Sequence, residues 1–100
     1  MKYGLSDSEF LFLEEHLIAP LKKNGARVFL FGTRATGKYK KFSDIDILYK
    51  CSTAAITNSE IYRLLSFLEE SNFPYKIDLV SDSDLAASYR ADVEKNWIEL

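Results

Sequence analysis

Two short apolar runs, joined by a basic connection that contains glycine, constrain the fold of this chain more than any other feature. Residues 27–31 and 45–49 each form a run of strand length. Gly32-Thr33 follows the first run, Asp44-Ile45-Asp46 opens the second, and ten residues separate Thr33 from Asp44. This connection leaves room for a turn that folds the second strand back beside the first.

Helical patterns alternate with these strands. Ser6 and Glu9 have the spacing of a capping box, as do Thr57 and Glu60, and apolar residues recur at helical spacing after both pairs. Pro20 is expected to kink the first helix or end it early. The expected elements are helix 6–24, strand 27–31, a short helix over 34–38 with Thr33 as its N-cap, strand 45–49, helix 57–72, strand 75–80, helix 84–95 and an extended end over 97–100. The prediction is therefore an α/β (α+β) fold, a small mixed β-sheet flanked by helices in the order α-β-α-β-α-β-α.

Composition limits the classes of function. One hundred residues with 47% hydrophobic content suit a single domain, residues 1–100. No apolar run has the length of a membrane span, no export leader is evident, and Cys51 is the single cysteine, so we expect a cytoplasmic protein. The formal net charge of -2 has the wrong sign for a protein that binds long nucleic acid. A small ligand or a protein partner fits this balance better.

Three aspartates are the candidate metal ligands. Side chains alternate along a strand, so Asp44 and Asp46 are expected on one face, while Ile45 and Ile47 point into the core. Asp78 lies in the later apolar run, again opposite to its apolar neighbours. Aspartate is depleted in strands, and like charges on one face repel each other. Taken alone, an Asp-x-Asp pair fits a capping residue and a solvent-facing strand residue as well as it fits a metal site.

The Gly-Thr pair and the basic residues after it are the candidate phosphate contacts. Gly32 lets a ligand approach the backbone, and the Thr33 hydroxyl can donate a hydrogen bond to a phosphate oxygen. A helix start offers free N–H groups to an anion. The basic residues that follow are Arg34, Lys38, Lys40 and Lys41. They fit a solvated loop or a polyphosphate contact, and the sequence does not decide which of them would touch phosphate; Arg34 and Lys38 are the candidates.

Two further reactive residue types carry no functional signal. His16 lies beside the apolar stripe of the first helix without a second metal-type ligand at helical spacing, so it is interpreted as an ordinary flanking side chain. Nothing near Cys51 marks an activated thiol.

Together, Gly32-Thr33, the ten-residue spacing, Asp44-Ile45-Asp46 and the later Asp78 resemble the nucleotidyltransferase superfamily of the DNA polymerase beta type. More narrowly, the chain resembles the minimal nucleotidyltransferases (MNT), which occur beside a helical HEPN partner. The resemblance implies that Gly32 and Thr33 hold the terminal phosphates of ATP. It also implies that Asp44 and Asp46 bind two Mg²⁺ ions, and that Asp78 helps bind one of them and serves or orients the base. The family usually has serine where this chain has Thr33, so the hydroxyl is kept and a methyl group is added.

The resemblance implies a reaction and a partner. The larger enzymes of the superfamily carry an extra domain that holds the acceptor, so a second protein is expected to complete the site. MNT antitoxins transfer AMP from ATP to a tyrosine of a HEPN ribonuclease toxin, and this is the expected function. Two alternatives stay open. The chain could mask a partner by contact without catalysis, or it could nucleotidylate a small molecule in a pocket that a homodimer builds across its interface.

Overall fold

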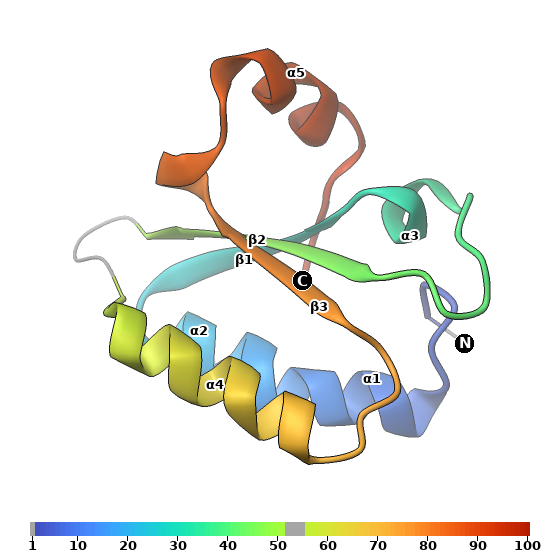
Figure 1. Cartoon of the computed structure of the whole chain (residues 1–100). Coiled ribbons are helices and arrows are strands. Elements are labelled where there is room, and N and C mark those ends of the chain that lie inside the picture. The colour runs from blue at the N-terminus through green and yellow to red at the C-terminus, as the bar shows by residue number, and fades with distance from the viewer. Residues whose placement is uncertain (1, 52–55) are drawn as a thin grey trace.

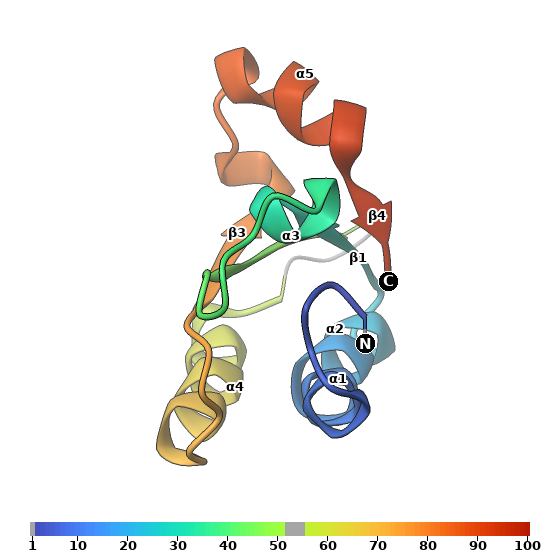
Figure 2. The ribbon, with the colours of Figure 1, turned by 90° about the vertical axis from the view of Figure 1, so that its right-hand side faces the viewer.

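The computed structural model describes residues 2–51 and 56–100. A small sheet lies between two layers of helices (Figures 1 and 2). The elements are α1 (Asp7–Leu13), η1 (Glu14–Ile18), α2 (Ala19–Lys23), β1 (Ala26–Phe31), α3 (Thr33–Thr36), β2 (Ile45–Cys51), α4 (Asn58–Glu70), β3 (Ile77–Ser81), η2 (Asp82–Asp84), α5 (Ala87–Asn96) and β4 (Ile98–Glu99). The predicted order is confirmed, and the expected extended end is the short strand β4.

The four strands form one mixed sheet with the order β3-β2-β1-β4. β1 pairs antiparallel with β2 and with β4, whereas β2 and β3 are parallel. The parallel pair needs a crossover, and α4 supplies it. In this register Phe31 lies opposite Asp46, and Asp46 lies opposite Asp78. Phe31, at the end of the first predicted run, and the candidate acids Asp46 and Asp78 therefore lie in one row across three neighbouring strands.

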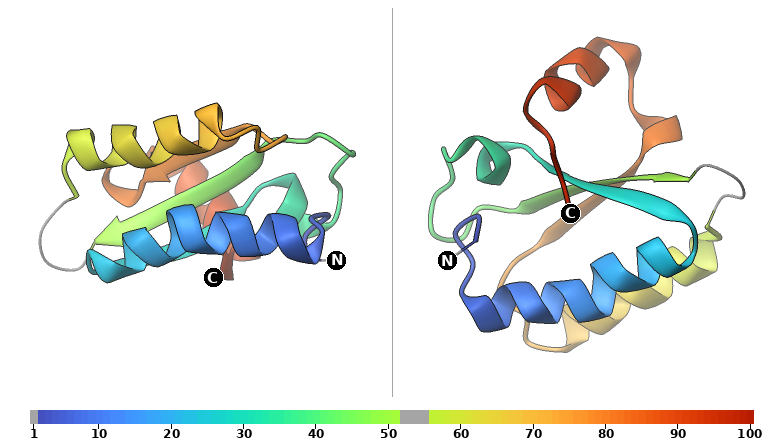
Figure 3. Two further views of the ribbon diagram at one scale, coloured as in Figure 1. Left: turned by 90° about the horizontal axis from the view of Figure 1, so that it is seen from below. Right: turned by 180° about the vertical axis from the view of Figure 1, so that it is seen from behind.

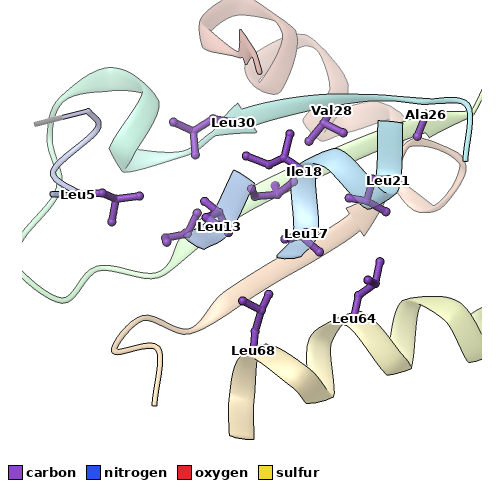
Figure 4. Close-up of a cluster of buried hydrophobic side chains, with 12 residues drawn as sticks. Leu5, Leu13, Leu17, Ile18, Leu21, Ala26, Val28, Leu30, Leu64 and Leu68 are labelled. Carbon is purple, nitrogen blue, oxygen red and sulfur yellow. The ribbon is translucent and has the colours of Figure 1, made fainter. Parts of the chain in front are cut away.

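One face of the sheet carries the main hydrophobic core. The helical stretch from α1 to α2 and helix α4 pack side by side under this face (Figure 3). Leucines from both helices meet apolar residues of β1 and β2, and all of these are buried (Figure 4): Leu13, Leu17, Ile18, Leu21, Val28, Leu30, Ile45, Ile47, Leu64 and Leu68. Burial of this many side chains stabilises the strands that carry the candidate site residues.

The first helix begins and ends as predicted but passes through Pro20. Ser6 and Glu9 form the capping box at its start, and Asn24 caps its end before Gly25 takes a positive φ. The expectation that Pro20 ends the helix early is wrong. A π-helical turn, η1, precedes the proline and the helix continues to Lys23. The wider turn accommodates a residue that has no N–H to donate and whose ring crowds the preceding turn.

Helix α5 lies on the other side of the sheet from the main core, and the residue that follows it packs on this second face. Trp97 follows α5 directly, and its ring stacks on Phe29 of β1 with the ring centroids 4.0 Å apart. Helix α5 begins at Ala87, not at the expected residue 84, because residues 82–84 form a separate 3₁₀ turn. Arg90 of α5 bonds both the carboxylate and the carbonyl of Asp82 and so ties the helix to that turn. None of the helices in the described parts of the chain has the length and apolar character needed to cross a membrane.

Candidate active site

The three candidate aspartates lie at the start of β2 and in β3, which run side by side. Asp46 and Asp78 are direct neighbours across the parallel pair, and Asp44 precedes the first residue of β2. Ile45 and Ile47 are fully buried on the core face, whereas Asp46 is half-buried and Asp44 is exposed. The alternation therefore places the acids on the face away from the main core, as the sequence predicts.

Gly32 lies against the Asp46 carboxylate. A Cβ at Gly32 would collide with Asp46 Oδ2, and the backbone φ of Gly32 is +74°. Glycine is the residue that adopts this conformation at little cost and leaves the space open. Gly32 is also the N-cap of α3, and Thr33 is its first helical residue, so the expectation that Thr33 caps this helix is wrong. The turn nevertheless brings the Gly-Thr pair to the acids.

The electrostatics of Asp46 show how closely the acids lie. The pKa of Asp46 is raised from its ordinary 3.8 to about 6, first by burial and then by the negative charges of Asp78 and Asp44. The positive charge of Arg34 acts in the opposite direction. Ionisation of Asp46 is therefore less favourable than that of an exposed carboxyl group, because burial and two like charges oppose it.

The acids are not drawn together into a closed ligand cage. Within residues 2–51 and 56–100, no three His, Cys, Asp or Glu side chains are grouped as a metal ion requires. Asp44 lies in exposed backbone just outside β2, so its side chain can turn without disturbing the sheet. Asp46 and Asp78, by contrast, are fixed by strand pairing.

A pocket of about 300 Å³ opens beside the Gly-Thr pair. Residues at the end of β1 and in α3 form one wall, and Asp92, Val93 and Asn96 of α5 form the other. Figure 2 shows α3 and α5 on the same side of the sheet. The sequence analysis missed the α5 residues. No local pattern marks them, because they reach the site through a long-range packing of the last helix.

The basic connection divides into exposed lysines and one buried arginine. Lys38, Lys40 and Lys41 are exposed, as a solvated loop or a phosphate contact requires. Arg34 is only 2% exposed, and its guanidinium donates hydrogen bonds to backbone carbonyls of Tyr3 and Ser43. These donors of Arg34 are used inside the protein, so the structure favours the exposed Lys38 over Arg34 as a phosphate contact.

The two residues interpreted as ordinary lie away from the acids. The His16 ring packs between Phe12 and Phe67, with centroid distances of 4.4 and 4.7 Å. Cys51 is half-buried at the end of β2, opposite Ala26.

Comparisons with known proteins give the family. The family model described as "Polymerase beta, Nucleotidyltransferase" matches residues 15–99. This range contains the Gly-Thr pair, the three acids and the whole sheet. A search of the curated proteins found no match.

Several solved structures share the fold. A chain from a toxin–antitoxin complex with AMP-PNP is 22% identical, with a TM-score of 0.66 over 86% of this chain and 70% of the other. A chain from a mutant toxin–antitoxin MntA–HpeT is 21% identical, with a TM-score of 0.63 over 96% and 72%. A third comes from the tri-AMPylated Shewanella oneidensis HEPN toxin in complex with MNT antitoxin, at 20% identity and a TM-score of 0.57 over 88% and 69%. At these identities the likeness establishes the fold, and the match over residues 15–99 establishes the family. The chain belongs to the polymerase beta nucleotidyltransferase family.

Proposed function

We propose that this chain is a metal-dependent nucleotidyltransferase that moves AMP from ATP to a tyrosine hydroxyl of a HEPN-type toxin and thereby acts as its antitoxin. The observation that carries the proposal is the pairing of Asp46 with Asp78 across β2 and β3, directly beside Gly32. Membership of the family supports the reaction class.

The donor set fits Mg²⁺. Carboxylate oxygens are the ligands that this ion prefers, and it needs only one or two of them together with phosphate oxygens and water. The raised pKa of Asp46 also fits a cation site, because a bound cation would offset the repulsion from Asp78 and Asp44. Asp46 and Asp78 would form the fixed part of the ligand set, and Asp44 would turn in from its exposed position to complete it. Two such ions are the expected number.

The Gly-Thr pair would hold the terminal phosphates. The Thr33 side chain is exposed next to Gly32, and its hydroxyl is free to donate to a phosphate oxygen. Lys38 follows Gly37 at the end of α3 and is exposed, so its ammonium group can reach a polyphosphate. The pocket between α3 and α5 offers space for another part of the nucleotide.

The transfer balances as a displacement at the α-phosphorus. The acceptor oxygen forms a bond to this phosphorus, the bond from phosphorus to the bridging oxygen breaks, and pyrophosphate leaves. Asp78 is exposed on the edge strand β3, and in this proposal it would take the proton of the attacking hydroxyl. Bound Mg²⁺ would neutralise the charge that develops on the phosphate oxygens.

The partner is inferred from the structures that share the fold. Toxin–antitoxin complexes recur among them, one with AMP-PNP and another with an AMPylated HEPN toxin. We therefore expect the acceptor to be a tyrosine of a HEPN-type protein. Incubation of the chain with labelled ATP, Mg²⁺ and such a protein encoded beside it should label that protein. Absence of label with the parent chain, or equal label with Asp46→Asn, would contradict the proposal.

A second candidate function is masking of the partner by contact alone. Its specific support is a set of exposed apolar side chains on the helices, including Leu11, Tyr62 and Phe67. A folded variant with Asn in place of Asp44, Asp46 and Asp78 separates the two functions. If this variant still neutralises the toxin, masking is sufficient; if neutralisation is lost, catalysis is required.

A further inference from the structure

Arg34 is a buried cation whose partners are backbone carbonyl groups. Its Nε and Nη2 donate to the carbonyl oxygen of Ser43 at 3.1 and 2.8 Å, and its Nη1 donates to that of Tyr3 at 2.8 Å. The guanidinium also lies over the rings of Tyr39 and Tyr75, at 5.2 and 4.6 Å from their centroids. In the described parts of the chain, no carboxylate pairs with it.

Burial of a charged guanidinium costs free energy unless its N–H donors are hydrogen-bonded, as they are here. The planar fork of arginine can donate in several directions at once, whereas lysine is a point charge. Here the fork joins two segments that are far apart in the sequence, the turn around Tyr3 and the loop that ends at Ser43. Burial and the two flanking rings leave it little freedom to do anything else.

The Ser43 carbonyl belongs to the peptide group that leads into Asp44. On the other side of Asp44, the Ile45 N–H donates to the carbonyl oxygen of Lys76 at 2.9 Å. Hydrogen bonds to the backbone therefore hold both neighbours of Asp44. The Arg34 side chain donates to the carbonyl before it, and the N–H after it donates to the Lys76 carbonyl. The turn before it is closed as well, because the Lys40 N–H donates to Ser43 Oγ and the Ser43 N–H donates to the Lys40 carbonyl.

We propose that Arg34 is a positioning residue, which fixes the peptide before Asp44 so that this exposed acid stays within reach of the fixed pair Asp46 and Asp78. The role at a metal site rests on the proposed function, whereas the hydrogen bonds that fix the peptide before Asp44 do not depend on it. Arg34 touches neither nucleotide nor metal in this scheme. It acts through the backbone, as residues behind a metal ligand commonly do.

A substitution at Gly4 tests the contact between Arg34 and the turn that contains Tyr3. Gly4 has a φ of +80°, and a Cβ there would lie 2.7 Å from Arg34 Nη1 and would collide with the Tyr39 ring. Gly4→Ala should therefore displace the guanidinium without removing its charge. This variant reaches the loop before Asp44 through the Tyr39 ring as well as through Arg34, so its result is compared with those of the two Arg34 variants.

The test uses the full chain and compares Arg34→Lys, Arg34→Met and Gly4→Ala with the control Arg63→Met. Arg63 is an exposed arginine of α4 that pairs with Glu60 of the same helix, so its loss removes a cation without touching the loop. Hydrogen exchange of the Asp44 and Ile45 amides by NMR gives the first measurement. Mn²⁺ binding by electron paramagnetic resonance gives the second, and neither requires turnover.

We expect faster exchange at these two amides in all three variants, while the amides of β1 keep their parent rates. We also expect Mn²⁺ affinity to fall about 10-fold in Arg34→Met and less in Arg34→Lys, with Arg63→Met unchanged. Parent-like exchange in folded Arg34→Met would overturn the inference, as would parent-like Mn²⁺ affinity. If the parent itself binds no Mn²⁺, the proposed function fails and the exchange measurement alone decides the role of Arg34. If Arg34→Met does not fold, Arg34→Lys and Gly4→Ala carry the comparison by the same criteria.

Discussion

Asp46 and Asp78 lie directly opposite each other on adjacent parallel strands, so the pairing of β2 with β3 sets the distance between these two acids. A pair held in this way cannot separate to relieve its repulsion without breaking the sheet. Burial of Asp46, together with the nearby charge of Asp78, raises the pKa of Asp46 to about 6. Repulsion between these acids destabilises the folded chain, and a bound cation would reduce this repulsion and so stabilise the fold.

The first prediction concerns the stability of the metal-free chain. Asp46→Asn keeps the size of the side chain and removes one of the facing charges, so the variant should melt a few degrees higher than the parent at pH 7 without metal. A gain of about 4 °C corresponds to roughly 1 kcal/mol for a domain of this size. Thermal unfolding followed by circular dichroism measures it. The same variant should lose nucleotidyl transfer.

The second prediction is the pH dependence of that difference. The folded chain holds the Asp46 proton up to a pKa of about 6, whereas the unfolded chain releases it near 3.8. Between these values the folded state binds more protons, so this residue makes the free energy of unfolding fall as pH rises through the window. The advantage of Asp46→Asn over the parent should therefore be largest at pH 7 and should vanish near pH 4.

Melting curves of both proteins across this range, with and without Mg²⁺, test the sign. Mg²⁺ should raise the melting temperature of the parent at pH 7 more than that of Asp46→Asn, because the variant has lost a ligand. A parent that gains stability relative to the variant as pH rises in metal-free buffer would contradict the assignment of the raised pKa.

The third prediction compares two glycines to separate the effect of backbone strain from that of a steric clash with Asp46. Gly32 and Gly37 both have positive φ, +74° and +83°, but a Cβ would strike the Asp46 carboxylate at Gly32 and meets nothing within 4 Å at Gly37. Both alanine variants should lose roughly 1 kcal/mol of stability from backbone strain. Only Gly32→Ala should also displace Asp46, and it should lower transfer at least about 100-fold, by analogy with misplaced reacting groups.

Steady-state transfer by the two variants, each measured well below its melting temperature, makes this comparison. Equal losses of activity in Gly32→Ala and Gly37→Ala would show that strain in the α3 turn, and not the approach to Asp46, explains the need for glycine at residue 32.

The sequence predicts the strands well, and also the face of β2 on which Asp46 lies, because both rest on local patterns. Alternation along residues 45–49 puts Ile45 and Ile47 in the core, and a strand so anchored must present Asp46 on its other side. The capping box at Ser6 and Glu9 likewise depends only on residues within one turn. Such features survive folding because the tertiary structure reinforces the local preference.

Long-range contacts explain what the sequence cannot show. Arg34 looks like one basic residue among four, and only the fold brings the carbonyls of Tyr3 and Ser43 around it. The pocket wall from α5 escapes local analysis for the same reason. Pro20 is tolerated because a π-helical turn, which no residue pattern signals, makes room for it.

The fourth prediction concerns the methyl group of Thr33. Thr33→Ser keeps the hydroxyl and restores the residue usual in the family, so it should keep transfer within about 3-fold of the parent. Thr33→Val keeps the shape and removes the donor, so it should weaken ATP binding by about 1–2 kcal/mol. Thr33 is exposed, so loss of its methyl group in Thr33→Ser leaves no buried cavity. ATP titration by calorimetry in the presence of Ca²⁺, which supports binding without turnover, measures the difference, and equal affinities would exclude a phosphate contact by this hydroxyl.

The fifth prediction tests whether the C-terminal segment holds the pocket wall in place. Trp97 stacks on Phe29 at 4.0 Å, between the end of α5 and β4, so Trp97→Ala removes the aromatic contact that joins the end of α5 to the sheet. The free energy of unfolding should fall by about 2–3 kcal/mol. Tyr89→Ala is the matched control, because that aromatic residue of α5 is 65% exposed and its loss should change stability by no more than about 0.5 kcal/mol. Urea unfolding of both variants measures the two values. If Trp97→Ala were as stable as Tyr89→Ala, the last helix would not depend on the sheet for its place, and Asp92 and Asn96 could not be held beside Thr33 by this packing.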